Sequence, residues 1–180
     1  PDAARALLES AGYADGDVHF ELAMDASASG NIQLMYQVIQ QFLQAVGIQT
    51  EIKSYDSSSW LDVRKSGEMD AYINTWTMDY NDPANIMFTF FGNDEKTAIR
   101  SLNYPNEEVM ARVAAASGIT DDETRMAEYQ ALEKQIVEED AAWVPLLGNT
   151  HLFAIGERVE SFTPYWAGYS NFYARNVILK

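Results

Sequence analysis

The chain has 180 residues, of which 27 are acidic and 12 are basic, so its net charge at pH 7 is −15. This charge argues against nucleic acid as a partner, because phosphate backbones are bound by clustered Lys and Arg. Cysteine is absent, which excludes disulfide scaffolds, thiol catalysis and cysteine-based zinc sites. Only two histidines are present, so we expect no metal site or other cofactor.

The hydrophobic share of 47% indicates a globular chain, and no apolar run approaches the ~18 residues that a membrane span requires. The chain opens at Pro1 without an initiator Met or a signal peptide, so we expect it to be cut from a longer protein.

Helical and strand patterns alternate over the first 76 residues. Gly12, Gly47 and Gly67 each follow a helical stripe, and Asn31 is the expected N-cap of the second helix. This order of elements favours an α/β fold with a mainly parallel sheet and helices on its faces. The expected helices span 2–11, 32–46 and 57–66, and the expected strands span 18–24, 48–52 and 70–76.

The rest of the chain is predicted to be mainly helical. An apolar helix is expected at 84–91, another begins at Pro105, and Thr120 with Glu123 forms a capping box for a long helix. Two short strands are expected at 142–147 and 152–155. Six aromatic residues then fall within twelve positions, either as a local core or as an exposed interface: Phe162, Tyr165, Trp166, Tyr169, Phe172 and Tyr173.

Ligands of open parallel sheets bind beyond the carboxyl ends of the strands, which directs attention to loops 25–31 and 77–83. The second loop follows Trp76 and contains Asp79, Tyr80 and Asp82. A carboxylate there can pair with an ammonium group, and the aromatic rings offer apolar area.

The acids at the strand exits also have simpler interpretations. Asn-Asp-Pro is a common turn initiator, so Asp82 is expected to cap the helix that opens at Pro83. For Asp79, a turn former and a ligand contact are both open. Asp25 and Asp56 are expected to be loop formers. A glycosidase-like pair of Asp79 and Asp82 is disfavoured, because residues three apart on one loop rarely flank a scissile bond.

Several stretches, in this order and spacing, resemble the C-terminal lobe of extracytoplasmic solute-binding proteins of ABC importers. The similar family is the one that binds dipeptides, oligopeptides and nickel complexes, and Val109 and Met110 depart from its usual pattern. The matching stretches are 3–13 (AARALLESAGY), 40–52 (QQFLQAVGIQTEI), 67–72 (GEMDAY), 76–83 (WTMDYNDP) and 103–108 (NYPNEE).

The resemblance implies one lobe of a two-lobed, type II periplasmic-binding-protein architecture that closes on its ligand by a hinge. Residues 1–148 would form the truncated lobe, and 149–180 would be a crossover segment that returns to a missing N-terminal lobe. An extracytoplasmic location is implied, in the periplasm or at the cell surface, with or without a lipid anchor on the full-length parent. An ABC permease in the membrane would be the partner.

The resemblance also implies a non-enzymatic function, the capture of short peptides or other small solutes. In peptide-binding members the Asp of the W-x-x-D pattern takes the peptide's α-ammonium, and this Asp falls on Asp79 and the Trp on Trp76. We expect Met78, Tyr80 and Asn81 to complete the binding loop.

Two alternatives stay open at this point. One is a carbohydrate receptor of the same fold, with aromatic side chains stacked on sugar rings. The other is a hydrolase that uses Asp79 and Asp82. The stacking residues of the carbohydrate receptor would be Trp76, Tyr80, Trp166 and Tyr169.

Overall fold

The computed structural model describes residues 1–148, 150–165 and 174–180. The chain divides into two compact units, and each is described here by itself. The first comprises residues 1–75 and 94–105, and the second comprises 76–93 and 106–180. The expected division at residue 148 lies inside the second unit and stays a prediction.

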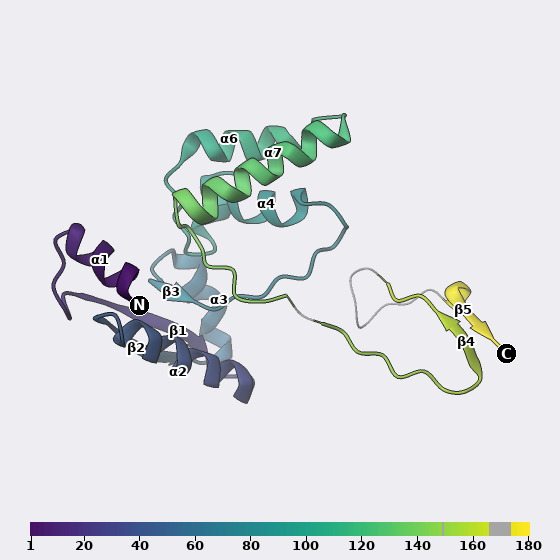
Figure 1. Cartoon of the computed structure of the whole chain (residues 1–180), viewed down its shortest axis with the longest axis horizontal. Coiled ribbons are helices and arrows are strands. Elements are labelled where there is room, and N and C mark those ends of the chain that lie inside the picture. Colours follow the sequence, from purple (N-terminus) through teal and green to yellow (C-terminus); the bar gives the residue numbers. More distant parts are fainter. Residues whose placement is uncertain (149, 166–173) are drawn as a thin grey trace. The chain divides into compact units, whose positions relative to one another are not determined.

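The first unit contains a three-stranded parallel sheet in the order β2–β1–β3 (Figure 1). The strand β1 (Val18–Asp25) lies in the centre and pairs along its whole length with β2 (Ile48–Tyr55). Its middle residues Leu22, Ala23 and Met24 are buried, as expected for a strand with neighbours on both sides. The predicted α/β architecture with a parallel sheet is confirmed.

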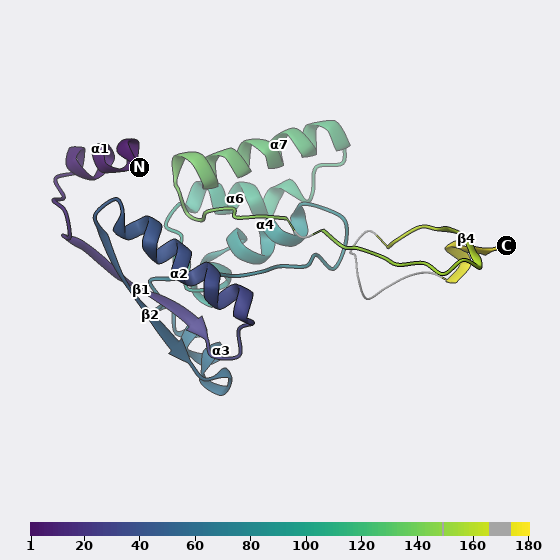
Figure 2. The same ribbon diagram turned by 60° about the horizontal axis from the view of Figure 1, so that its bottom comes forward.

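The helices of this unit are α1 (Asp2–Ser10), α2 (Gly30–Gln44), α3 (Ser57–Ser66) and α5 (Asp94–Ala98). Gly12, Gly47 and Gly67 follow three of these helices, as predicted, and have φ values of 86°, 90° and 79°, the left-handed conformation that glycine adopts without strain. Figure 2 shows α2 lying along β1 and β2.

The expected N-cap of α2 is wrong. The N-cap is Ser29 rather than Asn31, because the Ser29 carbonyl already accepts the first helical hydrogen bond, from Gln33 N. Phe42, an apolar residue of this helix, is 70% exposed. The helix instead buries Tyr36, which packs with Leu22 and Met24.

The Tyr36 hydroxyl joins three elements of the first unit. It donates to the carbonyl of Ala23 on β1 at 2.7 Å and accepts from the amide of Ile73 at 2.9 Å. Ile73 follows β3 (Ala71–Tyr72), so this bond engages the first amide beyond the strand. The third strand is therefore two residues long instead of spanning 70–76, and the chain from Ile73 onward is irregular.

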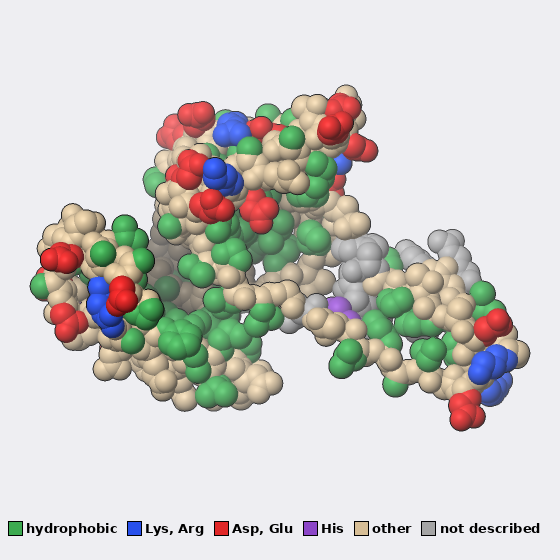
Figure 3. Space-filling view, in the orientation of Figure 1, with side chains coloured by type: hydrophobic (Ala, Val, Ile, Leu, Met, Phe, Trp, Pro, Cys, Tyr) green, Lys and Arg blue, Asp and Glu red, His purple; other side chains and the backbone are tan. Residues whose placement is uncertain are grey.

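Helices form the core of the second unit. They are α4 (Ala84–Phe91), α6 (Glu107–Ala116) and α7 (Asp122–Lys134), which continues into a short π-helix, η1 (Gln135–Glu139). α6 packs against both α4 and α7, and acidic side chains gather over α6 and α7 (Figures 1 and 3). The buried side chains of this core include Met87, Phe90, Phe91, Val109, Met110, Val113, Tyr129, Leu132 and Ile136.

The expected capping box at Thr120 is wrong by one position. Asp121 is the N-cap of α7, and its carboxylate accepts from the amide and the hydroxyl of Thr124 at 2.9 and 2.6 Å. Asp and Thr both serve as caps, and Asp121 is the residue in the extended conformation that a cap requires.

Neither strand expected at 142–147 and 152–155 forms among the described residues. Alternating apolar residues make a strand only where a second strand supplies hydrogen bonds, and Val144 and Leu152 are instead 77% and 92% exposed. The antiparallel pair lies further along, between β4 (Val159–Phe162) and β5 (Val177–Leu179), with the 3-10 helix η2 (Ala174–Asn176) between them.

The aromatic cluster near the end of the chain is only partly within the described residues. Phe162 lies on β4, with its ring centroid 5.3 Å from that of Phe153. Trp166, Tyr169, Phe172 and Tyr173 lie outside the described residues. Among the helices that the structure describes, none is long and apolar enough to cross a membrane.

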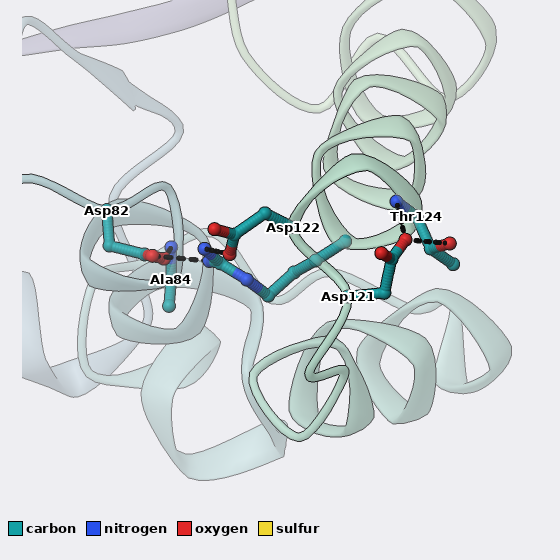
Figure 4. A network of polar contacts seen from close by, with 6 residues as sticks. Asp82, Ala84, Asp121, Asp122 and Thr124 are labelled. Atoms are coloured by element: carbon teal, nitrogen blue, oxygen red, sulfur yellow. Dashed lines mark hydrogen bonds and ion pairs between the residues drawn. The ribbon is translucent and has the colours of Figure 1, made fainter.

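Asp82 joins α4 to α7 within the second unit (Figure 4). Its Oδ1 accepts from the amide of Ala84 at 2.9 Å, and its Oδ2 forms an ion pair with Arg125. Arg125 also contacts Asp122 at 3.0 Å. The prediction that Asp82 caps this helix is wrong in position, because α4 begins at Ala84 and its N-cap is Pro83; the Asp82 carboxylate nevertheless accepts from the first amide of the helix.

Replacing Tyr36 by Phe should destabilise the first unit. The substitution leaves the Ala23 carbonyl and the Ile73 amide without their described partner, which should lower the free energy of unfolding by about 1–3 kcal/mol. Denaturant unfolding measures this loss. Tyr13→Phe is the control, because Tyr13 is 51% exposed. Equal effects of the two substitutions would contradict a linking role for the Tyr36 hydroxyl.

Asp82→Asn should lower the Tm of the protein by a few degrees, because the ion pair with Arg125 and the negative charge at the start of α4 are both lost. Asp122→Asn removes the other carboxylate from the same guanidinium. Its side chain is 89% exposed, so the expected shift is much smaller. Thermal unfolding of both variants provides the comparison, and a larger shift for Asp122→Asn would refute the linking role of Asp82.

Candidate functional site

A cavity of about 210 Å³ opens at the carboxyl ends of β1 and β3, within the first unit. This is the edge at which ligands of parallel sheets bind. The loop after β1, the start of α2, α3 and the segment after β3 all contribute side chains. The lining residues are Asp25, Ala28, Ile32, Tyr36, Trp60, Ile73, Asn74 and Thr75.

Asp25 is the one acidic residue of this lining. Its Oδ1 accepts three hydrogen bonds, from the amide and hydroxyl of Ser27, both at 2.8 Å, and from the hydroxyl of Ser57 at 2.9 Å. The Ser27 amide, followed by the two hydroxyls, holds the pKa of the Asp25 carboxyl below its usual value. The prediction that Asp25 forms its loop is confirmed, and Asp25 stays ionised at neutral pH.

A second carboxylate, Asp56, stands at the start of α3. It accepts from the amides of Ser58 and Ser59 at 3.1 and 3.2 Å and is the N-cap of the helix. Hydrogen bonds from the Ser58 and Ser59 hydroxyls, together with these amides, lower its pKa to about 2. Asp56 acts on Asp25 by charge repulsion, so two ionised carboxylates contribute negative potential to this end of the sheet.

Aromatic side chains form part of the cavity wall. The Trp60 ring meets the Tyr72 ring edge-on, with centroids 5.9 Å apart, and lies 6.4 Å from the Tyr55 ring. These contacts fix the orientation of the indole. Tyr36 contributes only its ring, because its hydroxyl is engaged by Ala23 and Ile73.

The loop residues predicted from the sequence lie in the second unit and are not among the residues that line the cavity. Trp76 is 39% exposed, and its indole N–H donates to Asn85 Oδ1 at 2.8 Å. Its ring meets Phe90 edge-on at 5.3 Å. Asn85 and Phe90, both on α4, therefore hold Trp76 in place and leave part of its ring at the surface.

The other predicted loop residues differ in exposure. Met78 is partly buried, whereas Asp79, Tyr80 and Asn81 are exposed. The Tyr80 carbonyl accepts from the Asp82 amide at 2.9 Å, which closes a tight turn over Asn81. Exposure leaves the side chains of Asp79, Tyr80 and Asn81 accessible to a ligand.

The two carboxylates of this loop, those of Asp79 and Asp82, differ in their contacts. Asp82 is committed to Ala84 and Arg125, whereas the Asp79 carboxylate forms no hydrogen bond or ion pair with any described residue. This difference removes the geometric basis for an acid–base pair of Asp79 and Asp82. Of the two, only Asp79 keeps its charge available.

Sequence reasoning missed most of the cavity wall. Tyr36 follows Ile32 by one helical turn, so the i, i+4 spacing on α2 is the signal that could have identified it. Trp60 lies in the first turn of α3, shortly after the end of β2. Its position after a strand is the signal that could have placed it at the carboxyl edge of the sheet, where the cavity opens. No group of three or more potential metal ligands occurs within the described residues.

A model of a protein family matches residues 1–98, which is more than half of the chain. It describes the middle region of the bacterial extracellular solute-binding proteins, family 5. The match covers the whole βαβαβ order and the loop with Trp76 and Asp79.

Several relatives match most of the chain. Heme-binding protein A of Haemophilus influenzae is 27% identical over 179 residues, which cover 98% of this chain and 32% of that protein. The probable D,D-dipeptide-binding periplasmic protein DdpA of Escherichia coli is 31% identical over 125 residues, covering 68% of this chain and 24% of the relative. The dipeptide-binding protein of Pseudomonas aeruginosa is 28% identical over 164 residues, covering 90% and 31%.

Solved structures of solute-binding proteins are also similar to this chain. The structure of HbpA2 from Haemophilus parasuis has a TM-score of 0.82 at 25% identity and covers 99% of this chain and 35% of that protein. A dipeptide-binding protein of Pseudoalteromonas in complex with Met-Leu has a TM-score of 0.68 at 22% identity, covering 77% and 28%, which supports the fold. The chain spans about a third of the length of these relatives.

Family 5 solute-binding proteins are extracytoplasmic binding proteins of transport systems and not enzymes, which rules out the hydrolase alternative. The periplasmic-binding-protein fold, the parallel sheet and the family match all agree with one another. This chain therefore belongs to the bacterial extracellular solute-binding proteins of family 5.

Proposed function

We propose that this chain is the substrate-capture lobe of a peptide receptor for an ABC importer, and that Asp79 binds the α-ammonium group of the peptide. The observation that carries the proposal is the free, exposed carboxylate of Asp79 beside a neighbouring acid, Asp82, that is fully committed to the fold. An exposed carboxylate without a described cationic partner is suited to an ammonium ligand.

The surroundings of Asp79 suit a peptide. Trp76 and Tyr80 stand three residues before and one residue after it, and both rings are substantially exposed. Trp76 is held by Asn85 and Phe90, so the exposed part of its ring is presented without a large loss of side-chain entropy on binding. Met78 and Asn81 supply further apolar and polar contact from the same loop.

The names of several relatives support a peptide ligand. Proteins of Pseudomonas aeruginosa similar to this chain are di/tripeptide-binding and dipeptide-binding proteins, and a similar protein of Escherichia coli is the periplasmic oligopeptide-binding protein OppA. Since the chain spans about a third of such relatives, we place it in a longer receptor with an N-terminal lobe, and residues 149–180 are the segment that returns to that lobe.

The same proposal places the receptor outside the cytoplasm, where it delivers its ligand to an ABC permease. A lipid anchor on the parent protein is compatible with this role. The carbohydrate alternative also depends on Trp166 and Tyr169, which lie outside the described residues, and it stays a prediction.

Replacing Asp79 by Ala in the full-length receptor should weaken the binding of short peptides about 10- to 100-fold, because one charge-assisted hydrogen bond contributes about 1.5–3 kcal/mol. Calorimetric titration measures the loss. Asp62→Ala is the matched control, since Asp62 is also exposed but lies on α3. An N-acetylated peptide lacks the ammonium group and should bind equally weakly to wild type and Asp79→Ala. Unchanged affinity in Asp79→Ala would show that Asp79 is not the amine anchor.

Heme is a second candidate ligand, because Heme-binding protein A aligns with 98% of this chain. The two ligands can be separated by titrating the full-length receptor with heme, followed through its visible absorption band, and with a dipeptide, followed by calorimetry. We expect saturable binding of the dipeptide and none of heme. Saturable heme binding without peptide binding would replace the peptide proposal.

A further inference from the structure

The cavity of the first unit has a composition that the family assignment does not explain. Its volume of about 210 Å³ is below the roughly 300–1,000 Å³ of sites that enclose a whole small-molecule ligand. A space of this size suits one side chain. We propose that it binds the cationic side chain of a basic residue in the peptide, with Asp25 as the partner of the charge and Trp60 as the wall beside it.

The charge of the cavity favours a cation. All described hydrogen bonds to the Asp25 carboxylate come from neutral donors, the amide and hydroxyl of Ser27 and the hydroxyl of Ser57, and all three end on Oδ1. Within the described residues, Asp25 forms no ion pair with Lys, Arg or His, and Oδ2 accepts no hydrogen bond. The negative charge of Asp25 is therefore fixed in position but not neutralised, and Asp56 reinforces it.

The walls suit the stem and the head of such a side chain. Ala28, Ile32 and Ile73 offer aliphatic surface, against which the methylene groups of a long basic side chain pack. The face of an indole attracts a cation, and Trp60 is held in orientation by its contacts with Tyr55 and Tyr72. A carboxylate, an indole and an aliphatic floor together match an ammonium or guanidinium group on an apolar stem.

This inference rests on the proposed function only for its claim that the cation belongs to a peptide.

The test uses the full-length receptor and two dipeptides, Ala-Lys and Ala-norleucine. Norleucine keeps the four-carbon side chain of lysine and lacks its ammonium group. Wild type should bind Ala-Lys about tenfold or more tightly than Ala-norleucine. In Asp25→Asn the ratio of the two affinities should fall close to one.

Two controls separate this inference from the peptide proposal. Asp79→Asn should leave the ratio of the two affinities unchanged, because it removes no charge from the cavity. Asp62→Asn should leave both affinities and the ratio unchanged. Equal binding of the two dipeptides to wild type would overturn the assignment of the cavity, whereas peptide affinities that respond to Asp79→Asn would still support the proposed function.

A probe without a peptide decides the case in which neither dipeptide binds. The 180-residue chain is labelled with ¹⁵N-tryptophan, and Trp60→Phe identifies the Trp60 indole N–H resonance among those of the four tryptophans. n-Butylammonium chloride should shift this resonance. Asp25→Asn should abolish the shift, and n-butanol should cause none. A shift that persists in Asp25→Asn, or no shift at all, would overturn the inference.

Discussion

The hydroxyl group of Tyr36 is the contact on which the first unit depends. Tyr36 is 2% exposed, and its hydroxyl bridges the Ala23 carbonyl of the central strand and the Ile73 amide that follows β3. A buried hydroxyl with both a donor and an acceptor role is fully satisfied. This bridge ends strand pairing at Tyr72 and holds the segment of Ile73 at the wall of the cavity. Thr75, the last lining residue in the chain, directly precedes Trp76 and the proposed anchoring loop.

Four acids follow strands in this chain, and their different surroundings give them different roles. Asp56 caps α3, whereas Asp82 accepts from the first amide of α4 and forms an ion pair with Arg125 of α7. Asp25 is fixed by two serines at the edge of a cavity, and Asp79 is exposed with no described partner. The same residue type at similar positions along the sequence thus serves either stability or recognition, according to whether its lone pairs are already used.

The order and type of the elements up to residue 67 could be read from the sequence, because hydrophobic periodicity and helix-ending glycines are local signals. The predictions for 70–76, 142–147 and 152–155 failed for a common reason. An alternating pattern describes the two faces of a strand, but it contains no information about which backbone supplies the hydrogen bonds. Ile73 bonds to a side chain, and no strand pairs with the later segments in the described part of the chain.

The sequence by itself determined the family, the α/β class, the helical second half and the loop from Trp76 to Asp82, because each is carried by contiguous residues. Tertiary structure decided which acid is free, since the partner of Asp82 is Arg125, 43 positions away. It also decided the composition of the cavity, whose walls come from Asp25, Tyr36, Trp60 and Ile73 on four separate segments. Local propensity acts between neighbours in the chain, whereas charge pairing and cavity formation depend on neighbours in space, which only the folded backbone brings together.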